Sequence, residues 1–240
     1  MEQIKILTAR RAYEFRPDDL RLSVLSVAQV YQQIQQFFGF GVAVVATPQQ
    51  MFGPVPNTIP PGLVFDYGAT QTPEELPTPI RFLHFEPRRI VVDVAGPSSA
   101  IDWTFEQLQR VLAEIRAPDG SPSIGEPERM RDYSEISAHY DFDFGVMVGG
   151  PLLELARRTT NEEGHSAIPL SIRFRAVDPA EEVHPAEVGQ PSLSQGQMFE
   201  IRAGTRPKDR TFFSAAELTT DQHLAWLESL EAVMDSGRAR

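Results

Sequence analysis

The segment from Glu135 to Phe144 alternates strictly between polar and apolar side chains. A period of two residues is typical of a β-strand that has one face on a hydrophobic core and the other face in water. No helix sorts these residues into two faces, because helical side chains repeat every 3.6 residues. The side chains expected on the core face are Ile136, Ala138, Tyr140, Phe142 and Phe144. This segment therefore predicts a strand that is half-buried in a sheet.

The rest of the chain divides into further strands and helices by the same test of periodicity. The predicted strands are 4–15, 20–26, 41–46, 63–70, 79–85, 89–95, 130–144, 168–176, 198–204 and 211–218. The predicted helices cover 27–38, 104–116, a stretch opening at Gly149-Gly150-Pro151, and 220–235. Ser26 is expected to cap the first helix and Gly39 to end it. Thr104 and Gln107 are expected to form a capping box for the second helix.

The order of elements is nearly the same in the two halves of the chain. Each half is expected to run strand, helix, strand, long loop, strands that end in a proline-tipped hairpin, and a final helix. Near the two final helices, Thr104-Phe105-Glu106-Gln107 corresponds to Thr219-Thr220-Asp221-Gln222. The pattern indicates an internal repeat.

This layout predicts an α+β fold with two pseudo-repeated halves, each an antiparallel sheet with two helices on one face. The predicted division is residues 1–116 for the first half, 117–128 for a Pro-, Gly- and Ser-rich linker, and 129–240 for the second half. The element order is similar to that of the TATA-binding proteins, whose duplicated fold also repeats strand, helix, several strands and helix.

Composition narrows the function mainly by exclusion. The formal net charge of −11 disfavours nucleic acid and anionic membranes as partners. The chain has no cysteine, which excludes disulfides, thiolate metal sites and a cysteine nucleophile. No apolar run has the length of a membrane span, and the first residues lack the pattern of a signal peptide, so we expect a cytoplasmic protein.

The polar face of the 135–144 segment is the first candidate site. His139, Asp141 and Asp143 fall on one side of an extended strand, where imidazole and carboxylates could bind a divalent cation. Three ligands in a row on one strand splay apart, so a further ligand such as His84 or Asp93 is needed, and only a meeting of the two sheets would supply it. The alternative is an ordinary solvated strand face.

The two hairpin tips are the second candidate site. Both tips are basic, and paired positive tips suit an anionic partner such as nucleic acid, a nucleotide or an acidic protein surface. The residues concerned are Arg88, Arg89, Arg206, Lys208 and Arg210. The alternative is the usual charge of an exposed turn.

The long Pro-rich loop after the strand at 41–46 is the third candidate. Met51, Phe52 and Val55 place apolar side chains where solvent is expected, which often marks a partner surface. The loop could instead fold over the sheet face that the helices leave bare.

Three functions follow from these candidates. We expect a non-catalytic binding or assembly protein without a cofactor, which acts through the open sheet face and the Pro-rich loops and forms a homodimer. The alternatives are a metal-dependent hydrolase that uses His139, Asp141 and Asp143, and a nucleic-acid-binding protein that uses the basic tips.

Overall fold

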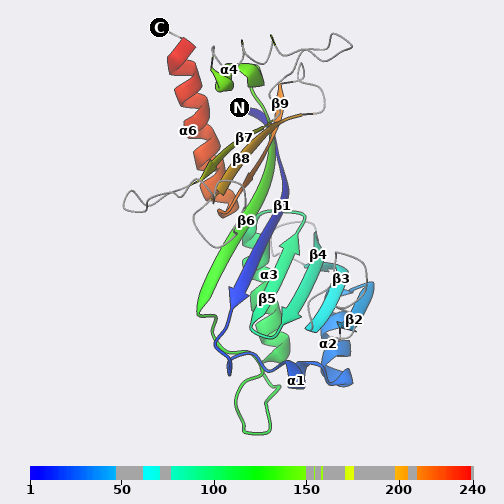
Figure 1. Ribbon diagram of the computed structural model, residues 1–240. Coiled ribbons are helices and arrows are strands. Elements are labelled where there is room, and N and C mark those ends of the chain that lie inside the picture. The colour runs from blue at the N-terminus through cyan, green and yellow to red at the C-terminus, as the bar shows by residue number, and fades with distance from the viewer. Residues whose placement is uncertain are drawn as a thin grey trace, which may run out of the picture. The chain divides into compact units, whose positions relative to one another are not determined.

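The computed structural model describes residues 1–46, 62–70, 77–149, 154, 158, 171–175, 198–204 and 210–238 (Figure 1). These residues form a mixed α+β fold with an antiparallel sheet of nine strands in the order β2-β3-β4-β5-β1-β6-β9-β8-β7. The chain forms two compact units, residues 8–133 and residues 1–7 with 134–240. We call them the N-terminal and the C-terminal unit.

The N-terminal unit carries helices on one face of its strands. Its elements are β1 (Glu2–Glu14, from Thr8 on), α1 (Leu22–Leu25), α2 (Ala28–Phe38), β2 (Val42–Ala46), β3 (Gly62–Thr70), β4 (Thr78–Glu86), β5 (Arg89–Val94) and α3 (Ser98–Leu112). The predicted hairpin is confirmed, with Glu86 opposite Arg89 across a two-residue turn. Alternate residues such as Phe65, Leu83 and Val92 pair across the strands and face the helices, where they are fully buried.

The C-terminal unit has its own core. Its elements are β6 (Arg129–His139, from Ser134 on), α4 (Phe144–Val148), β7 (Ser171–Arg175), β8 (Met198–Ala203), β9 (Thr211–Ala216) and α6 (Thr220–Arg238). Phe212 of β9 lies at the centre of this core, with the rings of Tyr140, Phe142 and Phe144 all within 5.6 Å of its own, centroid to centroid.

The predicted strand of the 135–144 segment is shorter than expected. Its five apolar side chains are all buried, as the alternation predicts. The strand ends at His139, however, and the amide of Tyr140 makes a last bond to the carbonyl of Arg210. A helix, α4, then begins at Phe144. The aromatic side chains beyond His139 therefore reach the core by packing around Phe212 from a turn and a short helix.

The predicted strand at 20–26 is wrong. Leu20 makes an isolated bridge to Ile124, and residues 22–25 form helix α1. Leu25 is fully buried in the helix-side core, which a short helical turn allows as well as a strand does. The alternation of three apolar residues was too short to separate the two conformations.

Two predicted helix starts are also wrong. The N-cap of α2 is Val27, and Ser26 instead ends α1. Helix α3 begins at Ser98, so Thr104 lies inside it and donates to the carbonyl of Ala100 at 2.6 Å. The predicted end of α2 is confirmed, because Gly39 adopts a left-handed φ of 63° there.

The segment predicted as a linker is held by the N-terminal unit. The amide of Arg21 donates to the carbonyl of Ser123 at 3.0 Å, and the amide of Gly125 donates to that of Asp19 at 2.7 Å. The predicted boundaries at 116 and 129 stay a prediction. Pro151, the long loops and the hairpin tip at 205–209 lie outside the described residues.

Candidate functional site

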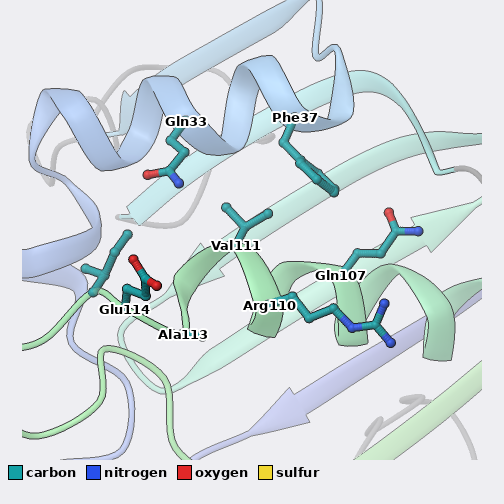
Figure 2. A pocket seen from close by; sticks show the side chains of 8 residues that line it. Gln33, Phe37, Gln107, Arg110, Val111, Ala113 and Glu114 are labelled. Carbon is teal, nitrogen blue, oxygen red and sulfur yellow. The ribbon is translucent and has the colours of Figure 1, made fainter.

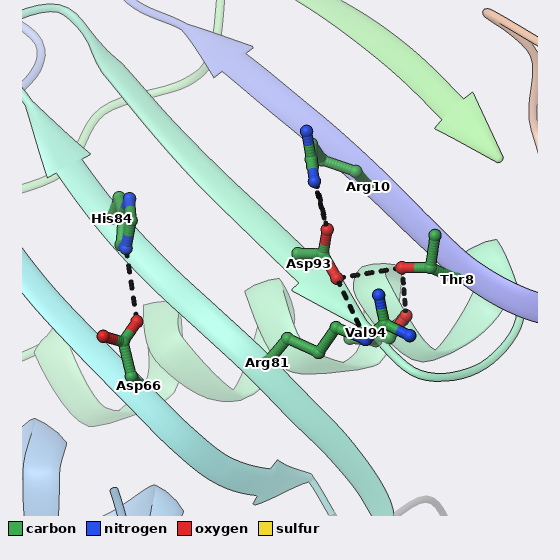
Figure 3. A network of polar contacts seen from close by, with 7 residues as sticks. All are labelled: Thr8, Arg10, Asp66, Arg81, His84, Asp93 and Val94. Atoms are coloured by element: carbon green, nitrogen blue, oxygen red, sulfur yellow. Dashed lines mark hydrogen bonds and ion pairs between the residues drawn. The ribbon is translucent and has the colours of Figure 1, made fainter. Parts of the chain in front are cut away.

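The sheet of the N-terminal unit has one face away from α2 and α3, which we call the open face. Strand register defines two rows of side chains across it. One row is Val44, Val64, His84, Val91 and Ala12, and the other is Val42, Asp66, Phe82, Asp93 and Arg10. Figure 3 shows the polar members of these rows in front of the strands, with α3 behind them. This face combines apolar, aromatic and charged groups in neighbouring positions.

Asp93 is the centre of a polar network on the open face (Figure 3). Its side chain is 0% exposed, although it carries a carboxylate. Arg10 contacts one carboxylate oxygen through Nε and Nη2, each at 2.8 Å, and Thr8 donates to the other at 2.9 Å. A buried charge persists only where it is paired and hydrogen-bonded. The network therefore fixes the position of Arg10.

Arg10 is also stacked against aromatic rings. Its guanidinium carbon lies 5.1 Å from the ring centroid of Phe82 and 5.7 Å from that of Tyr133. The ring of Phe82 in turn stacks on His84, with centroids 4.3 Å apart. Such cation–π and stacking contacts restrict the rotamers of all four groups. The result is a rigid row of planar side chains, which we call the stacked row.

The stacked row presents hydrogen-bonding groups. Among the described residues, Arg10 is bonded only through Nε and Nη2, which leaves Nη1 without a hydrogen-bond partner. His84 Nε2 lies 3.4 Å from Asp66, a long contact, and its side chain is partly exposed. A fixed guanidinium suits recognition of carboxylates and carbonyls, because less rotamer entropy is lost on binding.

The predicted metal residues lie at the end of β6 in the C-terminal unit. His139 is the last residue of the strand, and Asp141 and Asp143 follow in the turn. Arg210 reaches this turn, with Nε 3.3 Å from a carboxylate oxygen of Asp143 and Nη1 3.2 Å from the carbonyl of Asp141. A guanidinium next to a carboxylate competes with a cation for it. In the described part of the chain, no three His, Asp or Glu side chains gather as a metal ion would require.

The described basic tip carries acidic residues as well. Arg89 forms an ion pair with Glu86 at 2.7 Å. A cleft of about 460 Å³ beside it is lined by Glu14, Phe15, Glu86, Pro87, Arg88, Arg89 and Glu128. The carboxylates in this list outnumber the guanidiniums, so Arg88 and Arg89 do not form a purely positive surface. Arg206 and Lys208, like the apolar loop residues Met51, Phe52 and Val55, lie outside the described residues.

A groove runs between α2 and α3 (Figure 2). It has a volume of about 720 Å³. Phe37 points into it from α2 and Val111 from α3, with Gln33, Gln107 and Arg110 around them. Phe37 is 53% exposed, so the groove is open to solvent.

His223 of α6 is fully buried in the C-terminal unit. Its Nδ1 lies 2.8 Å from the hydroxyl of Ser134, and its Nε2 lies 2.8 Å from that of Ser214. Burial lowers the pKa of His223 to about 4. A neutral imidazole has one N–H, so one serine donates to the ring and the other accepts from it. All three side chains are buried, which identifies a structural network that substrates do not reach.

Sequence reasoning missed the pairing of Arg10 with Asp93. The available signal was a single aspartate inside the apolar strand Arg89–Val94, since a charge between buried valines requires a partner. Nothing local identifies that partner as Arg10, which lies 83 residues away in the chain. Only the register of β1 against β5 brings the two together.

No model of a known protein family matches the sequence, and a search of curated proteins also found no match. Within the described residues, none of the helices has both the length and the apolar character needed to cross a membrane.

Proposed function

We propose that the chain is a non-catalytic binding protein that recognises a protein partner through the open face of its N-terminal unit. The observation that carries this proposal is Arg10, which contacts two aromatic rings and is bound to the buried carboxylate of Asp93. Arginine and aromatic side chains dominate the binding energy of protein interfaces, above all where they are fixed before binding.

The composition of the open face indicates the kind of partner surface. The exposed valines Val42 and Val44 offer apolar contact, while Arg10, whose side chain is 45% exposed, offers N–H donors. We expect a partner that places apolar side chains over the valines and oxygen acceptors, either carboxylates or carbonyls, near the guanidinium of Arg10.

We also propose that the two units are a pseudo-repeat in the manner of the TATA-binding proteins. The support is a similar antiparallel pairing in each unit, of residues 9–14 of β1 with β5 in one and of residues 134–139 of β6 with β9 in the other. A long helix then follows each of these partner strands, α3 after β5 and α6 after β9. The metal-dependent and nucleic-acid-binding functions stay predictions without a specific supporting contact.

Affinity capture with two matched variants tests the binding proposal. His84→Ala combined with Arg81→Glu changes the open face, and Gln33→Ala combined with Phe37→Ser changes the groove between α2 and α3. We expect the wild type and the groove variant to capture the same partner. The open-face variant is expected not to capture it. That protein is then purified and titrated calorimetrically, with an expected loss of at least tenfold in affinity for the open-face variant. Equal binding by all three proteins would contradict the proposal.

A further inference from the structure

Strand β2 is the last strand at one end of the sheet. It pairs with β3 on one side, and no other strand of the described residues pairs with its second side. An edge strand exposes a row of backbone N–H and C=O groups that can bond to another strand. Natural proteins usually protect such an edge with charged residues, proline or a bulge.

The residues of β2 provide none of these protections. Its sequence, Val-Ala-Val-Val-Ala, contains no charge and no proline, and it pairs with β3 in continuous register. The strand at the opposite end of the order, β7, has the sequence Ser-Ile-Arg-Phe-Arg and so carries two arginines in five residues. Among the residues that the structure describes, charge therefore protects one edge of the sheet and not the other.

The backbone of β2 is oriented for a further strand. The amide of Gly41 donates to the carbonyl of Tyr67 at 3.3 Å, so residue 41 bonds toward β3. In an antiparallel ladder the bonding direction alternates along the strand. The N–H and C=O groups of Val42 and Val44 consequently point away from β3. Their side chains lie on the open face, and each valine is 39% exposed.

We propose that β2 pairs antiparallel with β2 of a second copy of this chain, so that one sheet continues through a two-fold dimer. A two-fold interface requires a surface that is complementary to itself. Pairing centred on Val44 places this residue opposite its own equivalent, and residue 42 opposite residue 46. These are the outward-bonding positions, so each pair exchanges two backbone hydrogen bonds. No like charges meet, because the strand has none.

The dimer has two expected physical properties. A contact along one short strand is small, so the dimer is weak and depends on protein concentration. Each copy has a formal net charge of −11, so the copies repel one another at long range. Salt screens this repulsion, and dimerisation is expected to strengthen as the ionic strength rises.

Sedimentation velocity on the full chain, over a roughly hundredfold range of concentration, tests the proposal. The wild type is expected to change from monomer to dimer as the concentration rises. Val44→Lys places two ammonium groups side by side at the two-fold axis and is expected to weaken the dimer at least tenfold. Val44→Thr keeps the β-branched shape without charge and is expected to dimerise. His84→Ala, which changes the proposed partner site on the open face without leaving a buried charge unpaired, is also expected to dimerise.

Oxidative cross-linking gives a second measurement that does not depend on a charge at the edge. The chain has no cysteine, so Val44→Cys introduces a single thiol. Hydrogen-bonded antiparallel pairs have Cα atoms about 5.5 Å apart, within the range of a disulfide. Val44→Cys is expected to form a covalent dimer under mild oxidation, whereas Phe37→Cys, on exposed α2, is not.

Several results would overturn the proposal. One is a monomeric wild type at all concentrations, which would mean that the edge stays free or is covered by a strand of the same chain. Another is a dimer unaffected by Val44→Lys, which would place the interface elsewhere. Loss of the dimer in His84→Ala but not in Val44→Lys would assign the interface to the open face. None of these results depends on whether the open face binds a separate partner.

Discussion

His223 lies between two buried serine hydroxyls, and each of these also contacts a backbone carbonyl. Ser134 lies 3.0 Å from the carbonyl of Leu218, and Ser214 lies 3.1 Å from that of Glu200. When the ring is neutral, the two serine hydroxyls and the one ring N–H supply three protons for these four contacts. The network thus connects α6 with β6, β8 and β9 without any charged group, which explains why a histidine occupies a position inside the core.

The stability of the protein is expected to fall in mild acid because of His223. Burial lowers its folded-state pKa to about 4, whereas the ordinary value is 6.5. Below pH 6.5 the unfolded chain therefore binds a proton that the folded chain does not, so this stabilisation is complete above pH 6.5 and is lost as the pH falls toward 4. The expected loss between pH 7 and pH 5 is about 2 kcal/mol.

Urea unfolding at several pH values measures this effect. His223→Gln keeps a side chain that can bond both serines but does not titrate. Its free energy of unfolding is expected to change less between pH 7 and pH 5 than that of the wild type. Parallel pH profiles for the two proteins would show that His223 is not the group responsible.

At the scale of elements, the Thr-x-x-Gln pattern alone does not determine where a helix begins. The Thr-x-x-Gln pattern occurs at Thr104 and at Thr219, yet only the second forms a capping box. The hydroxyl of Thr219 lies 3.3 Å from the amide of Gln222, whose side chain accepts from the amide of Thr219 at 3.2 Å. At Thr104 the helix has already begun six residues earlier, at Ser98, so the amides that a cap would satisfy are bonded within the helix.

Removal of the capping hydroxyl is expected to destabilise the C-terminal unit. Thr219→Ala leaves the amide of Gln222 without this acceptor and should lower the free energy of unfolding by about 1 kcal/mol. Ser236→Ala is the matched control, because that exposed hydroxyl bonds a carbonyl near the other end of α6. Denaturant unfolding followed by circular dichroism compares the two. An equal effect of both changes would contradict a capping role for Thr219.

At the scale of the whole molecule, the described residues form two hydrophobic cores that share no member. One contains residues such as Leu83 and Ile101 and lies within the N-terminal unit. The other is centred on Phe212 and Ile201 in the C-terminal unit. Cooperative unfolding follows contiguous cores, so we expect each unit to open as a unit of its own.

Native-state hydrogen exchange tests this expectation. Leu83→Ala creates a cavity that should cost about 2 to 5 kcal/mol. Protection is expected to fall for the amides of β3, β4 and β5 and to remain for those of β8 and β9. Ile201→Ala is expected to give the reverse pattern. A similar loss across both sets of strands would mean that the chain unfolds in one step.

The sequence predicted most of the strands because their apolar residues alternate over long enough runs. It also predicted the turn at Pro87 and the end of α2 at Gly39, since both depend on residues with special backbone preferences. The prediction from sequence failed where the local conformation or the partner of a side chain depends on distant parts of the chain. The helix at 22–25 directly follows Asp19 and Arg21, which bond to Gly125 and Ser123, and Asp93 is brought to Arg10 by strand register.

The protein has two tryptophans, and each belongs to a different unit. Trp103 of α3 lies under the guanidinium of Arg110, at 5.3 Å, and Trp226 of α6 stacks on Phe199 at 4.6 Å. The ring of Trp226 is also 6.4 Å from that of His223. Trp103→Phe thus leaves a single tryptophan, beside the buried histidine, and Trp226→Phe leaves a single tryptophan in the other unit. Each half of the molecule can be observed optically without an added dye.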